Sequence, residues 1–129
     1  MLAFKIGGKS AYPPLAKVEP VPAPSSPRQN TALAAKGDLL FEGYGCSACH
    51  GARGAAAGGK VPNLNRMPPA DLAMLKQVVQ QGALSANGML QFKGMPDSDA
   101  EALFAYVINE AWAAHDRSTR KPKQEGSKP

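Results

Sequence analysis

Two cysteines and a histidine stand close together in the segment Cys46-Ser47-Ala48-Cys49-His50. Their spacing, C-x-x-C-H, is that of the covalent attachment site of a c-type haem. Two thiols at this spacing can add to the two vinyl groups on one edge of a porphyrin, and the histidine that follows can coordinate the iron. The motif therefore predicts one covalent haem c, held by Cys46 and Cys49, with His50 as an axial ligand of the iron.

Two other chemistries use a C-x-x-C pair. A zinc site needs more ligands, but Cys46 and Cys49 are the only cysteines and the only other histidine is His115. A thioredoxin-like redox pair belongs to a βαβ unit, and the sequence has no such pattern. Haem attachment is therefore the preferred interpretation, and chance or purely structural cysteines are the alternative to it.

The chain has 129 residues and a formal net charge of +5, which suits one small domain. The charge is uneven, because residues 1–35 and 115–129 each carry a net +3 whereas residues 36–114 carry −1. A nucleic-acid-binding face needs clustered positive charge on a folded surface, so we expect no nucleic acid as a partner. A segment of this size buries little surface by itself, and a covalently held macrocycle would complete its core.

The sequence gives no sign of a membrane anchor or a leader. No apolar run approaches the length of a membrane span, and residues 1–8 are too short for the apolar region of a secretory signal. Because haem c is attached outside the cytoplasm in bacteria, we expect a periplasmic location and a leader that lies outside this sequence.

Both ends of the chain differ from its middle. Residues 2–6 form a brief alternating apolar run that ends at Gly7-Gly8, which predicts one β-strand and a turn. Residues 11–27 are rich in proline, which is typical of a semi-rigid linker or of a disordered arm. The last residues, 115–129, are polar and basic, as in a solvated tail. We therefore expect residues 10–30 and 116–129 to be mobile and dispensable.

Apolar residues recur at helical spacing near residues 31–43, 71–79 and 97–114. Asn30 or Thr31 can cap the first of these helices, and the glycines before the haem motif end it. The second follows a Pro-Pro pair and stops before a glycine. These segments predict an all-α fold.

The last helix has a further start signal. Asp97 or Ser98 can begin it, and Ser98 and Glu101 have the spacing of a capping box. After Ala114 the apolar positions cease. We therefore expect this helix to begin with that capping box and to end near residue 114.

Short motifs along residues 36–114 resemble those of a class I cytochrome c: Gly37-x-x-x-Phe41, C-x-x-C-H-G, Val61-Pro62-Asn63-Leu64, Gly88-Met89-x-x-Phe92 and Leu103-x-x-Tyr106. More narrowly, the chain is similar to the C-terminal haem c domain of quinohaemoprotein alcohol dehydrogenases, whose catalytic part is a propeller that binds pyrroloquinoline quinone (PQQ). Residues 2–9 resemble the closing strand of such a propeller, and a proline-rich linker joins the two domains in that family.

The resemblance implies an all-α class I cytochrome c fold, with three to five helices around one covalent haem c. It divides the chain into residues 1–9, a remnant of a propeller strand; residues 10–30, a proline-rich linker; residues 31–114, the cytochrome c domain; and residues 115–129, a basic flexible tail. PQQ would then be bound only by a partner domain that lies outside this chain.

The family implies a methionine as the second axial ligand, and Met89 and Met95 compete for this role. Met95 offers a Met-Pro dipeptide. Met89 stands three residues before Phe92 and well before the last helix, as the family pattern requires, so that Met89 is the favoured ligand. Phe92 and Leu64 complete the cofactor-binding residues that the resemblance implies.

Further roles follow from the resemblance. The carbonyl of Pro62 would accept a hydrogen bond from the free ring nitrogen of the ligand histidine, which orients the imidazole and makes it a stronger donor to iron. Gly37 and Phe41 would meet Leu103 and Tyr106 where the first and last helices cross. The glycine permits the two helices to approach closely.

Five residues have less certain places. Arg53 and Arg66 can pair with haem propionates, although an ordinary surface position is the alternative for both. Met67 and Met74 are expected to fill gaps in the core. His115 is expected to follow the last helix and to be exposed.

Two axial protein ligands would close the iron to oxygen and substrate, which leaves electron exchange as its chemistry. The family implies a domain that takes single electrons from a reduced quinone in a PQQ propeller domain, fused or separate. It would pass them to a soluble acceptor, such as a small cytochrome or a blue-copper protein, docked near Ala48, Ala52 and Ala55. The domain would not be an enzyme by itself. The alternative is a stand-alone haem protein with an open sixth site, either a gas sensor or peroxidase-like.

Overall fold

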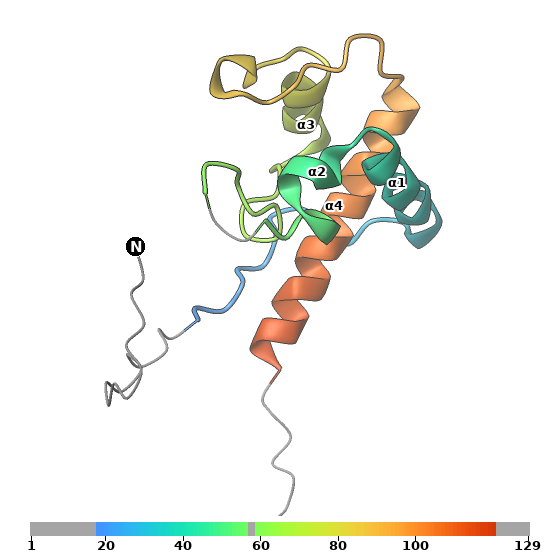
Figure 1. The fold of residues 1–129 in the computed structure, drawn as a ribbon. Coiled ribbons are helices and arrows are strands. Elements are labelled where there is room, and N and C mark those ends of the chain that lie inside the picture. The colour runs from blue at the N-terminus through green and yellow to red at the C-terminus, as the bar shows by residue number, and fades with distance from the viewer. Residues whose placement is uncertain (1–17, 57–58, 121–129) are drawn as a thin grey trace, which may run out of the picture.

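The structure is a computed structural model that describes residues 18–56 and 59–120. Within these residues every regular element is helical (Figure 1), as the sequence predicts: α1 (Thr31–Gly43), α2 (Cys46–His50), η1 (Ala52–Gly54), α3 (Leu72–Val79), η2 (Ser85–Asn87) and α4 (Asp97–Thr119). The strand predicted at residues 2–6 lies outside the described residues. In the described part of the chain, no helix is long and apolar enough to cross a membrane.

Helix α4 is the central element, and both α1 and α3 pack on it. At the crossing with α1, a Cβ atom on Gly37 would overlap the carbonyl oxygen of Ala102 and stand 2.7 Å from Cβ of Tyr106. The Phe41 ring, which is 2% exposed, packs on the Tyr106 ring at a centroid distance of 5.2 Å. Leu103 is buried in the same cluster. The structure thus has the predicted crossing, which only glycine at position 37 permits.

The first two long helices begin at side-chain caps. The Asn30 side chain accepts a hydrogen bond from the backbone nitrogen of Leu33 at 3.0 Å, so of the two candidates it is Asn30 that caps α1. The Asp71 carboxylate accepts one from the backbone nitrogen of Met74 at 2.7 Å. Each cap satisfies one of the amide groups that a helix start leaves without a partner in the helix.

The capping box predicted for α4 is wrong. Pro96 occupies the N-cap position, and the structure gives it no side-chain cap hydrogen bond. Ser98 and Glu101 are therefore displaced from the positions that a capping box requires. Asp97 and Asp99 lie in the first turn instead, where a carboxylate interacts favourably with the partial positive charge of the helix start.

Helix α4 continues to Thr119, five residues beyond its predicted end. Residues 18–30, which we call the strap, lie alongside this second half of α4 (Figure 1). His115 is half-buried within the helix, with Nδ1 at 2.7 Å from the carbonyl oxygen of Val21. The expectation that His115 follows the helix and is exposed is therefore wrong.

The mobility predicted for residues 10–30 and 116–129 stays a prediction, although in the described part of the chain residues 116–119 belong to α4 and residues 18–30 contact this helix. The strap has few apolar side chains, but its backbone is held by polar side chains of α4, including Asn109, Trp112 and Ser118. Hydrogen bonds thus replace the apolar burial that the sequence lacks. The exact boundaries between linker, domain and tail stay a prediction.

Candidate haem-binding site

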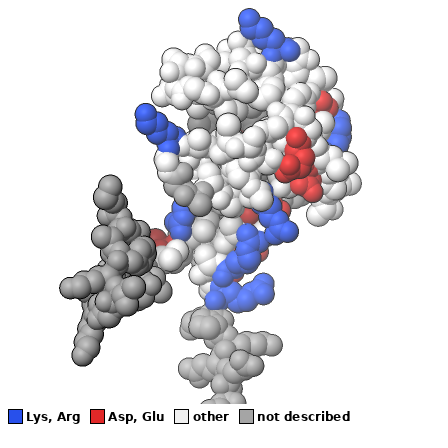
Figure 2. All heavy atoms as spheres, viewed as in Figure 1, with Lys and Arg blue, Asp and Glu red and all other residues white. Residues whose placement is uncertain are grey.

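A largely apolar cleft of about 680 Å³ opens between α2, α3, α4 and the loops at residues 59–64 and 84–92. Its walls include apolar side chains from the helical core, among them Phe41, Leu75, Val79, Leu103 and Val107. Figure 2 shows that the face over α2 and α3 carries mostly uncharged residues. A cleft of this size and composition fits a flat, mostly apolar ligand.

All three residues of the haem motif line this cleft. The short helix α2 begins at Cys46, after Gly45 in the left-handed region (φ 73°), and ends before Gly51 (φ 72°). Residues three apart on a helix lie on one face, so Cys46 and Cys49 can both reach the same edge of a ligand. Both are free cysteines in this structure.

The Cys46 thiol is the more buried of the pair. Its pKa is raised to about 11, chiefly by burial and also by the nearby Glu42 carboxylate and Cys49, against the opposing effect of a backbone hydrogen bond. A thiol with this pKa is protonated at neutral pH, and only the thiolate is strongly nucleophilic.

His50 is 7% exposed. Its Nδ1 atom lies 3.3 Å from the carbonyl oxygen of Pro62, and since a carbonyl only accepts, Nδ1 must carry the proton. The other nitrogen, Nε2, is then the one with a free lone pair, as a metal ligand requires. This is the contact that the resemblance implies for Pro62, and it fits an axial ligand to haem iron.

The segment after the motif turns tightly back to the cleft. Gly54 has φ 70°, and its carbonyl accepts a 2.8 Å hydrogen bond from the backbone nitrogen of Leu64. A Cβ atom on Gly54 would stand 3.0 Å from that of Leu64. Leu64, which the resemblance places beside the cofactor, lines the cleft. Arg53 is exposed.

The two competing methionines lie in different surroundings. Met89 is half-buried and lines the cleft, after Gly88 with φ 94°. Met95 is 7% exposed and belongs to the buried core cluster, and it is not one of the described residues that line the cleft. Phe92 also lines the cleft, and its backbone nitrogen donates to the Val79 carbonyl at 2.7 Å. The geometry therefore brings Met89, and not Met95, to the same cleft as His50.

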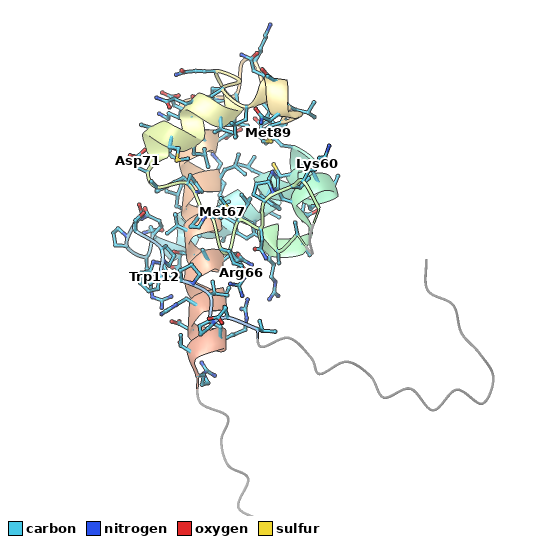
Figure 3. All side chains as sticks on the ribbon, turned by 90° about the vertical axis from the view of Figure 1, so that its left-hand side faces the viewer. Lys60, Arg66, Met67, Asp71, Met89 and Trp112 are labelled. Carbon is cyan, nitrogen blue, oxygen red and sulfur yellow. The ribbon has the colours of Figure 1, made fainter. Side chains whose placement is uncertain are left out.

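Met67 and Met74 were expected in the core, and this expectation is wrong. Their side chains are 69% and 47% exposed, and both line the cleft. Figure 3 shows Met67 and Met89 on the chain segments that border it. Flexible thioether side chains at a cleft can adapt to the shape of a bound ligand.

Arg66 has partners that the sequence did not suggest. Its guanidinium donates to the backbone carbonyls of Glu19 at 2.6 Å and Pro20 at 3.4 Å. Both acceptors belong to the strap, about 46 residues earlier in the chain. Arg66 therefore joins the strap to the cleft wall, and no local pattern could have predicted this contact.

Tyr44 is a second residue that sequence reasoning missed. Its hydroxyl donates to the Asp99 carboxylate at 2.9 Å, and its ring meets the Phe92 ring edge-on at 5.5 Å. The hydrogen bond to Asp99 raises the pKa of Tyr44 above its usual value. Tyr44 stands two residues before the haem motif. It thus connects this part of the chain to both α4 and the loop that carries Met89. The only feature of the sequence that pointed to this residue was its position directly before Gly45.

Among the described residues, no group of three or more His, Cys, Asp and Glu side chains is arranged to hold a metal ion. The donor groups at the cleft are the His50 imidazole, the two thiols of the motif and the thioethers of Met67, Met74 and Met89, which include the attachment groups and axial ligands of haem c. The residues present therefore fit this cofactor.

The chain matches the family model described as cytochrome c oxidase, cbb3-type, subunit III, over residues 32–107. It is 34% identical, over 98% of its length, to lupanine 17-hydroxylase (cytochrome c) of Pseudomonas sp, and covers 18% of that protein. It is 35% identical, over 87% of its length, to quinohemoprotein alcohol dehydrogenase ADH IIB of Pseudomonas putida, and covers 16% of it. The 1-butanol dehydrogenase (cytochrome c) of Thauera butanivorans is 29% identical over 88% of this chain.

The chain thus spans less than a fifth of the length of these relatives. No solved structure matches it significantly. The region matched by the family model begins in α1 and ends in α4, so that it contains the haem motif and both competing methionines. The chain belongs to the cytochrome c family that this model describes, and membership of this family implies covalent haem c. It is a cytochrome c electron-transfer domain related to the quinohaemoprotein alcohol dehydrogenases.

Proposed function

We propose that the domain transfers single electrons through one haem c, attached to Cys46 and Cys49 and ligated by His50 and Met89. The observation that carries this proposal is that all four side chains line one apolar cleft. When bound there, a haem with two protein ligands supplies one-electron redox chemistry and leaves no open position for oxygen or substrate.

The residues of the chain tune this site in three ways. The Pro62 carbonyl orients the His50 ring through its 3.3 Å contact with Nδ1. The apolar walls limit access of water and disfavour additional charge, which raises the reduction potential. Gly88, with φ 94°, allows the backbone turn that presents Met89, and Phe92 follows it at the same cleft.

In the complete protein, we infer that electrons arrive from a reduced quinone cofactor, PQQ, in a dehydrogenase domain that is fused or associated. The names of three relatives, which are alcohol or quinone dehydrogenases, support this inference. The electrons would leave to a soluble periplasmic acceptor, such as a small cytochrome or a blue-copper protein. Ala48, Ala52 and Ala55 are exposed beside the motif and are the proposed docking surface.

Covalent attachment is tested by extraction. The purified chain, produced in a host that matures c-type cytochromes, should keep its haem through acid–acetone treatment and show the mass of the chain plus one haem. Cys46→Ala and Cys49→Ala should each retain a single thioether bond. Complete loss of haem from the unaltered chain on extraction would contradict covalent attachment.

The second ligand is tested by the weak absorption band of methionine sulfur on ferric haem, at roughly 695 nm. Met89→Ala should remove this band and admit imidazole or carbon monoxide, because the cleft then lacks its second ligand. Met95→Ala is the matched control and should keep the band. If Met95→Ala alone removes it, Met95 is the ligand. If the unaltered chain has no such band and binds carbon monoxide, the site is open, as in a gas sensor or a peroxidase-like protein.

A further inference from the structure

The strap is fixed along one edge to the second half of α4. The backbone of Gln29 exchanges two hydrogen bonds with the Asn109 side chain, at 2.8 Å and 3.1 Å. The indole nitrogen of Trp112 donates to the Ser26 carbonyl at 2.9 Å. The Ser118 hydroxyl accepts from the backbone nitrogen of Val21, also at 2.9 Å. These contacts hold the strap over its whole described length.

The other edge of the strap holds residues 66–70, which we call the rim loop. At one end of the rim loop, Arg66 donates to the carbonyls of Glu19 and Pro20. At its other end, the Ser26 hydroxyl donates to the carbonyl of Ala70 at 2.7 Å. Figure 3 shows Arg66 and Trp112 beside α4, with Met67 next to Arg66. Both ends of the rim loop are therefore tied to the strap.

The rim loop forms part of the haem cleft, since Met67 and Pro69 both line it. The core holds this loop weakly, because Met67 is 69% exposed. Its local support is a turn in which the Asn63 carbonyl accepts from the backbone nitrogens of Arg66 and Met67 at 3.0 Å and 2.9 Å. This turn does not reach α4. At its C-terminal end the loop runs into α3, with the Ala70 nitrogen donating to the Met74 sulfur at 3.4 Å, and α3 packs on α4. The strap adds a second connection, which ties both ends of the loop to the other half of α4.

We propose that the strap is a positioning element of the haem cleft, and that Arg66 is the positioning residue through which it holds the rim loop closed. This inference rests on the proposed function, because it assigns the rim loop to the wall of a haem site. A guanidinium bonded to two carbonyls is a charge-assisted contact and stronger than a neutral hydrogen bond. Movement of the linker would therefore change how open the cleft is.

Two variants separate the strap from the arginine itself. Arg66→Ala removes the contact with the rim loop directly. Arg28→Ala acts only on the strap, because Arg28 pairs with Asp116 at 2.7 Å and lies 4.8 Å above the Trp112 ring, and it is not one of the described residues that line the cleft. Arg117→Ala is the charge-matched control, at an exposed position of α4.

The experiment uses the full chain with its haem attached and measures two quantities. The first is the rate at which imidazole binds the ferric haem, which reports opening of the cleft. The second is hydrogen exchange of the Met67 and Ala70 amides, which reports the rim loop without reference to the iron; Pro68 and Pro69, between them, carry no amide proton. Arg66→Ala should increase both by about tenfold, because local opening becomes easier when its hydrogen bonds are lost. Arg28→Ala should increase both by a smaller factor, and Arg117→Ala should leave both unchanged.

If Arg66→Ala raises the two rates but Arg28→Ala does not, Arg66 acts without the strap and the proposal is overturned. Unchanged exchange of the Met67 and Ala70 amides in Arg66→Ala overturns it as well. Arg66→Lys keeps the charge but loses the paired donors. Its rates of imidazole binding and amide exchange should lie between those of the alanine variant and the unaltered chain, and it replaces the alanine variant in the experiment if that variant does not fold. Failure of the proposed function has a different signature, namely a missing methionine band in the unaltered chain, and hydrogen exchange still tests the strap in that case.

Discussion

Two segments with little helix pack against α4, and they are held in different ways. The strap, at residues 18–30, is fixed by side chains of α4 that bond to its backbone. The methionine loop, which we define as residues 80–96, is fixed mainly by hydrogen bonds near its own ends, such as Phe92 nitrogen to Val79 oxygen and the Gln80 side chain to Met95 oxygen. Its remaining support is apolar, since Met95 is buried in the core.

The difference lies in α4 itself. Residues 102–108 are all buried and serve α1 and the haem cleft. Further along, polar groups at 109, 112 and 115 recur every three residues on one face, and these are the ones that bond the strap. One helix therefore positions the cofactor site by burial in one half and the linker by hydrogen bonds in the other.

The largest effect is expected where the methionine loop depends on burial. Met95→Ala should lower the free energy of unfolding by about 2–5 kcal/mol, because it leaves a cavity in the core. Chemical denaturation followed by the haem absorption measures this loss. Leu39→Ala, at a side chain that is 77% exposed, is the control and should change stability by less than about 0.5 kcal/mol. Equal losses in the two variants would mean that Met95 does not anchor the loop.

A smaller effect is expected where the strap depends on hydrogen bonds. Asn109→Ala should cost about 1–3 kcal/mol of unfolding free energy, because both backbone groups of Gln29 lose their partner in a half-buried place. Ser118→Ala removes one exposed contact with the strap and should cost about 0.5 kcal/mol or less. The strap would not be docked in solution if the two variants were equally stable.

The ion pair of the strap should contribute less again. Arg28 and Asp116 lie 2.7 Å apart, but their side chains are 54% and 45% exposed. A double-mutant cycle with alanine at both positions should give a coupling of about 0.2–1 kcal/mol. The coupling should fall as salt is raised to about 1 M, where charges are screened. A coupling that does not respond to salt would assign the stabilisation to the Arg28 contact with the Trp112 ring.

The features that could be predicted from the sequence are those that depend on residues close together in the chain. The haem motif, the Asn30 cap and the three long helices depend on neighbouring residues, and they could be read from spacing and composition. The side chain of Trp112 bonds to a residue 86 positions earlier, and no local pattern encodes that pairing. The prolines of the strap favoured the prediction that it is mobile, because proline indicates extended backbone but does not indicate which residues that backbone contacts.

The methionine loop was easier to anticipate than the strap, although it has no more regular structure. The spacing from Met89 to Phe92 and the glycine before it are local features, and the cleft contains both residues. The end of this loop was missed, because Pro96 displaced the expected capping box. Tyr44 was missed for the same reason as the strap, since its bond to Asp99 spans 55 positions.

The smallest expected effect concerns acid, and it acts on the methionine loop at the point where this loop enters α4. Asp97 and Asp99 lie where the methionine loop enters α4. The pKa of Asp97 is lowered chiefly by the hydrogen bond from Gln80 and then by Lys76, and that of Asp99 chiefly by the Tyr44 hydroxyl and then by Lys36. A carboxyl whose pKa is lower in the folded state stabilises the fold above its ordinary pKa. This stabilisation is lost as the pH falls through the folded pKa.

Acid should therefore loosen the α4 end of the methionine loop through these carboxyls. The Asn109 amide and the Trp112 indole, which hold part of the strap, do not titrate. The effect is small because the Asp97 side chain is 71% exposed and the half-buried Asp99 side chain still has 18% of its surface in contact with solvent. Tyr44→Phe isolates it, since the variant keeps the ring that meets Phe92 and removes only the donor to Asp99. A carboxyl titration by NMR should show the pKa of Asp99 moving up toward its ordinary value and that of Asp97 unchanged, which makes Asp97 the internal control. If the pKa of Asp99 stays low in this variant, Lys36 is its main partner and Tyr44 does not connect the haem motif to α4 through that bond.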